Sequence, residues 1–176
     1  LTLKLWSNGA KDNVQDKIRV KEVTLSNVTK KGTLSTTAAA DPQSNWTYSS
    51  DKISFTKEYE YGISVSPAQI IDGKLVSEGN NPGIPFENGL LLIPQTITNG
   101  DPILVTVVYY LHNEKDDLWE EKTLMTLLPE YTWPAGKRLT YNLVISGDKT
   151  FTKLDINTVV EDWIPHTEEI DFSEQI

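Results

Sequence analysis

The stretch EYTWPAGKRLTYNLVIS, which runs from Glu130 to Ser146, decides the fold. Pro134 fixes its own φ at about −65° and Gly136 tolerates a positive φ, so the letters WPAG predict a tight corner. We expect the ring of Trp133, at this corner, to pack over one end of a β-sandwich. After the corner, apolar and polar residues alternate, which predicts a long strand with one face toward a core. That face carries Leu139, Tyr141, Leu143 and Ile145.

The opposite face of this strand carries Thr140, Asn142 and Val144. The basic pair Lys137 and Arg138 keeps the entrance of the strand soluble. Folding alone explains a corner followed by a sandwich strand. The stretch by itself therefore predicts structure and not function.

The rest of the chain shows the same period of two and very little helical periodicity. The alternation runs from Leu1 to Trp6, from Ile18 to Val28 and, most strongly, from Ile103 to Leu111. It slips near Glu22, and because a one-residue slip turns the side chains to the other face, we expect a β-bulge there. The polar residues from His112 to Asp117 predict the tip of a hairpin.

One short segment departs from the alternation. Leu90 to Gln95 reads LLLIPQ and is almost continuously apolar. Such a run predicts a strand buried on both faces, which Pro94 ends or confines to a sheet edge. The prolines and glycines between Ser66 and Gly89 predict a long irregular connection before it.

The number and spacing of these segments predict an all-β protein. Turn signals separate short strands at intervals of about 8–12 residues, a pattern typical of a sandwich or a barrel. We expect an antiparallel β-sandwich of about seven or more strands with Greek-key character. Residues 1–163 would form this single domain, and residues 164–176 would follow it as an acidic tail.

The composition argues against several classes of protein. The 176 residues carry a formal net charge of −9, which disfavours nucleic acid as a partner because its phosphates repel an acidic surface. The absence of cysteine excludes disulfides and cysteine metal sites. No apolar run approaches the roughly 20 residues of a membrane-spanning helix. Since Leu1 opens directly on a strand pattern, we expect a fragment or a processed product whose export signal lies upstream.

Residues with catalytic or metal-binding potential form no recognisable motif. His112 and His166 lack the spacing of metal ligands, and no G-x-S-x-G sequence marks a nucleophile. The carboxylates of residues 116–117 and 120–121 could chelate Ca²⁺, but lysines flank them, a pattern more typical of a solvated hairpin. We therefore expect no catalytic residue, no metal, no cofactor and no enzyme.

The chain has five tryptophans, and packing in a core or at its rim explains most of them. Trp46 and Tyr48 alternate within a polar stretch and are the candidate exposed aromatics. Because such rings can stack on sugars, a surface-anchored glycan-binding β-sandwich module with no polymer role is the alternative function.

Several motifs, taken in order, carry a family resemblance. The chain reads VKEVTLSNVTKKGTL from Val20, NGLLLIPQTI from Asn88, ILVTVVYYL from Ile103, YTWPAGKRLTYNLVIS from Tyr131 and VVEDW from Val159. This succession resembles the C-terminal domain of the fimbrillin-like proteins of Bacteroidetes, the pilin-like and surface lipoproteins that include the major and minor fimbrillins. In that family a LIPQ strand, a W-x-A-G-K corner before a Tyr-rich strand, and a closing V-x-x-W recur in this order.

The resemblance implies a transthyretin-like β-sandwich, export as a lipoprotein, and a place in outer-membrane-associated fimbriae at the extracellular cell surface. In the family, proteolysis after an Arg removes an early strand of the N-terminal domain, and the exposed groove accepts a strand from a neighbouring subunit. The chain would therefore be a structural or adhesive subunit in pilus assembly and cell adhesion. Its partners would be other fimbrial subunits and host or bacterial surface receptors. The family's N-terminal domain and lipidated Cys are not among these residues, so contact with the membrane would pass through an upstream lipid anchor.

The acidic tail is the candidate strand for exchange. Ile170, Phe172 and Ile176 follow the period of two, although Glu174 occupies the remaining slot on that face. An extended peptide of this kind could add to an open sheet of a neighbour. The alternatives are a frayed acidic terminus and a last strand that folds back on its own sandwich.

Overall fold

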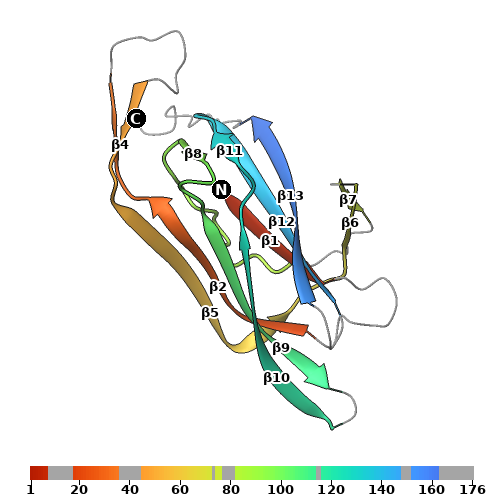
Figure 1. The fold of residues 1–176 in the computed structure, drawn as a ribbon. Helices are drawn as coiled ribbons and strands as arrows, with labels where there is room; N and C mark the ends of the chain where they lie inside the picture. The colour runs from red at the N-terminus through yellow and green to blue at the C-terminus, as the bar shows by residue number, and fades with distance from the viewer. Residues whose placement is uncertain are drawn as a thin grey trace, which may run out of the picture.

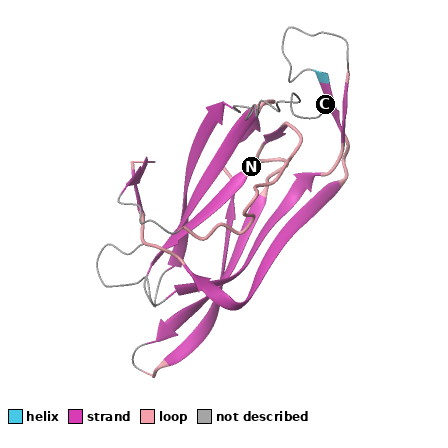
Figure 2. Ribbon diagram, turned by 180° about the vertical axis from the view of Figure 1, so that it is seen from behind, coloured by secondary structure: helices cyan, strands magenta, loops and turns pink. Residues whose placement is uncertain are grey.

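A computed structural model of the chain describes residues 1–7, 18–35, 45–72, 74–76, 82–113, 116–147 and 152–162. These residues form thirteen strands and no α-helix (Figures 1 and 2), so the described part of the chain is all-β, as the sequence predicts. Within these residues, no helix is long and apolar enough to cross a membrane.

The first of two main sheets contains the strand that follows the WPAG corner. It joins β1 (Thr2–Ser7), β12 (Lys137–Gly147) and β13 (Thr152–Asp162) in the order β1-β12-β13. β12 pairs with β13 in the antiparallel sense, whereas β1 runs parallel to β12. β12 is therefore covered on both of its edges over most of its length.

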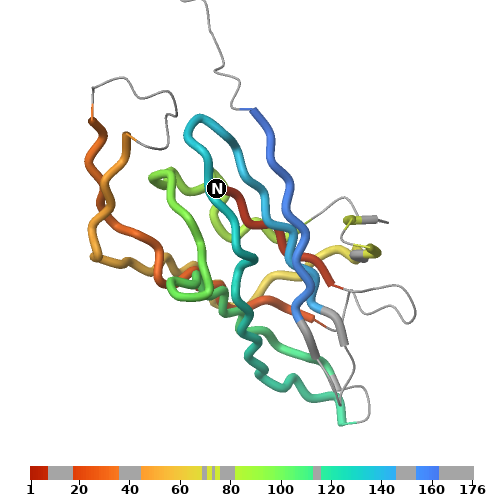
Figure 3. The backbone as a smooth tube through the Cα atoms, turned by 45° about the horizontal axis from the view of Figure 1, so that its top comes forward, coloured from red at the N-terminus to blue at the C-terminus, as the bar shows by residue number. Residues whose placement is uncertain are grey.

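The second main sheet contains the longest strands of the first half of the chain. It has the order β10-β9-β2-β5 and is antiparallel throughout. Its strands are β2 (Ile18–Thr29), β5 (Lys52–Ser64), β9 (Leu104–Asn113) and β10 (Leu118–Leu127). Figures 1 and 3 show the two main sheets as separate layers, with the β9–β10 hairpin reaching past the lower end of the other sheet.

Three small two-stranded sheets complete the described fold. They pair β3 with β4, β6 with β7, and β8 with β11. Their strands are Gly32–Leu34, Trp46–Tyr48, Gln69–Ile71, Lys74–Val76, Gln95–Ile97 and Tyr131–Trp133 in chain order.

The main core lies between the two large sheets and contains the predicted face of β12. All four of its side chains belong to this core and are at most 5% exposed. They face Val105, Val107 and Tyr109 of β9 and the apolar residues of β2 within the same cluster. The alternation read from the sequence therefore identifies the buried face correctly.

The WPAG corner has the predicted geometry. Gly136 has a φ of +68°, and an added Cβ would meet nothing within 4 Å, so the backbone conformation rather than space favours glycine there. Trp133 is 3% exposed, and its Nε1 donates a hydrogen bond of 2.9 Å to the hydroxyl of Tyr141. Burial raises the pKa of the Tyr141 phenol, although this hydrogen bond opposes the shift.

The bulge and the hairpin predicted from the sequence are also confirmed. The register of β2 shifts between Val20 and Glu22 against both of its neighbours. The β9–β10 hairpin closes with Asn113 opposite Leu118, around the polar tip.

One expectation about burial is wrong. The LLLIPQ run is not a strand buried on both faces, because β8 includes only its Gln95 and the side chain of Leu91 is 97% exposed. On the outer face of β12, Thr140, Asn142 and Val144 are all buried. Part of this face is covered because Val144 packs with Trp6, Ala68 and the half-buried Leu75 of β7 in a second, smaller core.

Candidate functional site

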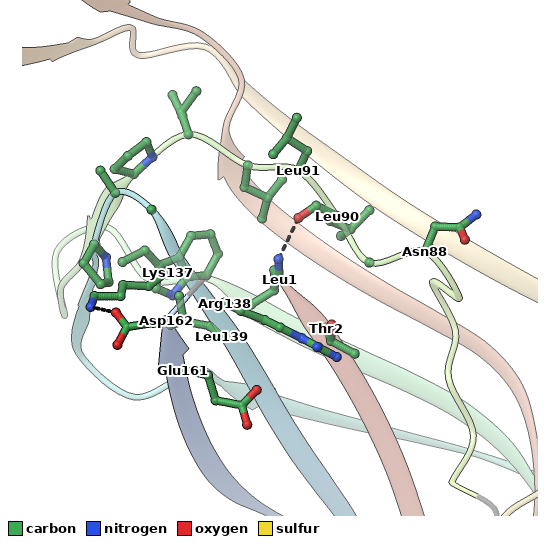
Figure 4. Close-up of a pocket in the computed structure, with 18 of the residues that line it drawn as sticks. Leu1, Thr2, Asn88, Leu90, Leu91, Lys137, Arg138, Leu139, Glu161 and Asp162 are labelled. Atoms are coloured by element: carbon green, nitrogen blue, oxygen red, sulfur yellow. Dashed lines mark hydrogen bonds and ion pairs between the residues drawn. The ribbon is translucent and has the colours of Figure 1, made fainter. Parts of the chain in front are cut away.

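A hollow of about 1040 Å³ opens at the end of the first sheet where β1 begins. Its wall is formed by the start of β1, the connection 84–94, the corner 133–136 and the adjoining ends of β12 and β13, together with Trp46 (Figure 4). We term it the strand-end hollow.

One side of the strand-end hollow is the start of β12. β1 enters the ladder with Thr2 opposite Thr140, whereas β13 accompanies β12 back to Lys137 opposite Asp162. The same register places Leu1 opposite Leu139. Among the described residues, no strand therefore pairs with Lys137 or Arg138 on the edge that β1 would occupy.

The other side of the hollow is the apolar connection. Leu1 and Leu90 exchange two backbone hydrogen bonds, since the Leu1 ammonium donates to the Leu90 carbonyl and the Leu90 N–H donates to the Leu1 carbonyl, each at 2.7 Å. Further along β1, Leu5 and Gly83 exchange a second such pair. The connection thus forms a second, strand-like neighbour of β1, on the edge away from β12.

The part of the hollow in line with β1 is termed the slot. β12 and the connection both pair with β1, so their backbones lie about 10 Å apart on either side of it. Figure 4 shows Leu1 at the mouth of this space, with Leu90 and Leu91 on one side and Lys137 to Leu139 on the other. An extended segment in line with β1 would meet a strand on either edge.

The lining of the hollow is mainly apolar on the side of the connection. Leu91 is almost fully exposed, and Leu92, Ile93 and Pro94 are half-buried. Ile93 and the Trp46 ring both approach Gly32, where an added Cβ would lie 3.1 Å from each of them. Trp46 thereby joins the β3–β4 hairpin to the wall of the hollow.

The β12 side of the hollow is charged. Lys137 pairs with Asp162, while the exposed Arg138 lies across the sheet from Glu161. Burial, and then the charge of Arg138, lower the pKa of the Leu1 ammonium. The slot therefore combines an apolar wall with a cationic group at its rim.

The predicted exposed aromatics lie in β4, at the side of the strand-end hollow. Trp46 is half-buried and lines it, and Tyr48 is 39% exposed. Trp6 and Trp133 are buried. Trp119 is 40% exposed, but the Arg19 guanidinium lies 4.7 Å from its ring centroid and the His112 ring 4.9 Å away.

The carboxylates at the β9–β10 hairpin have basic partners. Asp117 lies 2.9 Å from His112, Glu120 lies 2.7 Å from Lys122, and Glu121 lies 2.5 Å from Lys21. In the described ranges, no group of three His, Cys, Asp or Glu side chains could hold a metal ion. These contacts are those of a solvated hairpin.

The tail residues Ile170, Phe172 and Ile176, together with Trp163 and His166, lie outside the described residues. Their role as a strand for exchange stays a prediction. The slot itself was not identified from the sequence, although the LLLIPQ run that forms one of its walls was singled out there.

Comparison with known proteins finds similar folds among solved structures. No protein-family model and no curated protein matches the sequence. A candidate cell adhesion protein of Bacteroides ovatus is 18% identical with a TM-score of 0.45, and a fimbrial protein of Bacteroides vulgatus is 16% identical with a TM-score of 0.47. Each alignment covers 93% of this chain but only 44% and 53% of the respective neighbours, so the chain spans about half their length.

Proposed function

We propose that residues 1–163 form the sandwich domain of a structural or adhesive subunit of bacterial surface fimbriae, joined to its neighbours by strand exchange. The observation that carries this proposal is the strand-end hollow, where the apolar LLLIP segment lies beside the start of β1 with Leu91 exposed. The motif order of the fimbrillin-like proteins supports it independently, since that family assembles through strands accepted from neighbours.

The incoming strand would continue the line of β1. Its backbone would pair with Lys137 and Arg138 on one edge and with residues 91–93 on the other, so main-chain hydrogen bonds would supply much of the affinity. Its inward side chains would extend the row of Leu3 and Leu5 toward Leu139 and the LLLIP wall. Each apolar side chain buried there would contribute about 1.5–3 kcal/mol.

The acidic tail of a neighbouring copy fits this slot in pattern and charge. Ile170 and Phe172 are two residues apart, so both would point inward, and Asp171 between them would point outward toward Arg138. Glu174 occupies the next inward position of this period, where its carboxylate would have to remain in solvent or meet a basic partner.

In this proposal the chain acts at the cell surface through assembly and display rather than catalysis. A lipid anchor upstream of Leu1 would link it to the outer membrane, and its contacts would be other fimbrial subunits and surface receptors. The transthyretin-like strand arrangement and the lipoprotein character rest on the family resemblance.

Immunogold electron microscopy of native cells, with antibody against this domain, tests the function. We expect labelling along thin fibres or at their ends. Labelling flat on the envelope without fibres would contradict the polymer role. It would favour a glycan-binding module instead, with Trp46 and Tyr48 as its proposed stacking residues, for which tryptophan fluorescence should change on titration with polysaccharides.

A further inference from the structure

A second hollow, of about 510 Å³, lies on the outer face of the first sheet, beside the β6–β7 hairpin. Figures 1 and 3 show this hairpin next to β12 and β13, on the side away from the second sheet. We term this space the face hollow. It differs from the strand-end hollow in chemistry, because polar and cationic side chains form most of its lining.

The sheet register shows which residues form the floor of the face hollow. Lys4, Asn142 and Asn157 occupy one row across β1, β12 and β13, and Thr140 lies opposite Val159 in the next. Since Leu3, Tyr141 and Ile156 belong to or pack against the core between the sheets, the side chains in these two rows point outward.

Three cations surround this floor. Lys4 and Arg138 come from the first sheet, and Lys74 comes from β7 of the small hairpin. None of the three forms an ion pair with another residue in the described ranges, and Glu161 is the acidic residue among the lining side chains. In a chain with a formal net charge of −9, such a concentration of positive charge favours an anionic ligand.

Two nearly buried polar side chains on the floor of the hollow can form directional hydrogen bonds with a ligand. Asn142 is 4% exposed, with its Oδ1 accepting from Trp6 Nε1 at 3.4 Å and its Nδ2 donating to Asn157 Oδ1 at 3.1 Å. This fixes the amide and leaves one further N–H on Nδ2. Thr140 is 7% exposed and lines the hollow, where its hydroxyl is open to a water or to a ligand hydroxyl.

We propose that the face hollow binds a carboxylated saccharide, such as a uronic or sialic acid unit of a surface or host glycan. The carboxylate would lie among Lys4, Lys74 and Arg138, while Thr140 and the Asn142 amide would bind ring hydroxyls. Val159, which is 38% exposed, and Leu75 would contact an apolar C–H face of the sugar.

The position of the hollow favours a saccharide over an acidic peptide. An extended peptide binds most readily by adding to a free sheet edge, where it gains main-chain hydrogen bonds. The face hollow lies instead over strands that are already paired with one another, so recognition there depends on side chains. It makes no use of strand exchange and can operate whether or not the chain polymerises.

NMR titration of the full ¹⁵N-labelled chain tests this proposal directly. Sodium glucuronate should shift the side-chain amide signals of Asn142 and Asn157, whereas glucose and an equal concentration of sodium chloride should not. The double variant Lys4→Gln/Lys74→Gln should weaken glucuronate binding at least fivefold. Lys30→Gln removes the same kind of charge from an exposed position outside the hollow and should leave binding unchanged.

Four results would overturn the proposal, provided that the backbone spectra show the variants to be folded. The first is the absence of shifts at both amides in tens of millimolar glucuronate. The second is an equal response to sodium chloride or to glucose. The third is an equal loss of glucuronate affinity in Lys30→Gln and in the double variant, which would show that the effect depends on net charge alone. The fourth is a larger response to an acidic peptide than to glucuronate. These readouts are separate from fibre labelling, so either idea can fail alone.

Discussion

Two apolar stretches of this chain differ in how far their side chains are buried. The stretch from Leu139 to Ile145 is buried at all of its positions, whereas in Leu90 to Pro94 the side chain of Leu91 is 97% exposed and the others are half-buried. The difference lies in their neighbours rather than in their hydrophobicity. β12 has a strand on both edges and material over both faces, while the LLLIP segment pairs with Leu1 at one position and then borders the slot. An exposed apolar segment of this kind is typical of a surface that another chain segment covers.

The largest expected effect comes from truncating one leucine in each stretch. Leu143→Ala should cost about 2–5 kcal/mol of unfolding free energy, because Leu143 is fully buried and a cavity would remain. Leu91→Ala should change stability by less than about 0.5 kcal/mol, since its side chain is exposed already. Urea denaturation of both variants measures the comparison. Similar losses in the two would show that Leu91 belongs to the core of the isolated chain.

A smaller effect on stability is expected from Tyr141→Phe, within the buried stretch. This change keeps the ring but removes the acceptor of the Trp133 indole N–H, which is buried. We expect a loss of about 1–3 kcal/mol in unfolding free energy, the range for a buried polar group deprived of its partner. Denaturant unfolding followed by tryptophan fluorescence checks it, and an unchanged midpoint would contradict the importance of this bond.

The pH dependence of stability gives a second test of the buried Tyr141 side chain. Because burial raises the pKa of the Tyr141 phenol in the folded state, its contribution is fully present below the unfolded value of about 10 and is lost as pH rises through the folded pKa. Stability should therefore fall steeply above about pH 10, and less steeply in Tyr141→Phe. The measurement is the free energy of unfolding as a function of pH. Identical alkaline slopes would assign the loss to other groups, such as Tyr59, whose pKa burial also raises.

The buried stretch and its corner could be predicted from the sequence, but the slot could not. Alternation reveals which side chains face a core, and Pro134 and Gly136 encode the corner locally. The slot depends on Leu1 meeting Leu90 and on β1 lying parallel to β12, contacts between residues far apart in the chain. LLLIP has the composition of a buried strand, yet Leu91 is exposed and its neighbours are half-buried.

The face hollow was equally hidden from the sequence. Alternation places Thr140 and Asn142 on the face opposite the core, and their burial follows from the β6–β7 hairpin and neighbouring rows of the sheet. Lys4, Lys74 and Arg138 lie in three separate parts of the sequence. Their meeting is a consequence of the fold, so no local pattern could indicate it.

The smallest expected effect concerns the exposed ion pair beside the loop before β9. The hydrogen bond from Lys52, followed by that from Asn27, holds the pKa of Asp101 below its usual value. This contribution is present above the unfolded pKa and is lost as pH falls through the folded one. Asp101→Asn should cost less than about 1 kcal/mol at neutral pH because the pair is largely exposed. Urea denaturation at neutral and acid pH measures this, and a loss as large as that of Leu143→Ala would contradict the ranking.

The most direct test of strand exchange uses the absence of native cysteine. One chain carrying Ile170→Cys is mixed with another carrying Leu91→Cys under mild oxidation, and a parallel mixture uses Met125→Cys, which is exposed on β10 away from the strand-end hollow. Non-reducing gels report the mixed disulfide. If the tail enters the slot of a neighbour, the Leu91 pairing should form much faster than the Met125 pairing. Equal rates for the two positions, or no mixed dimer at Leu91, would contradict donation of the tail to this slot.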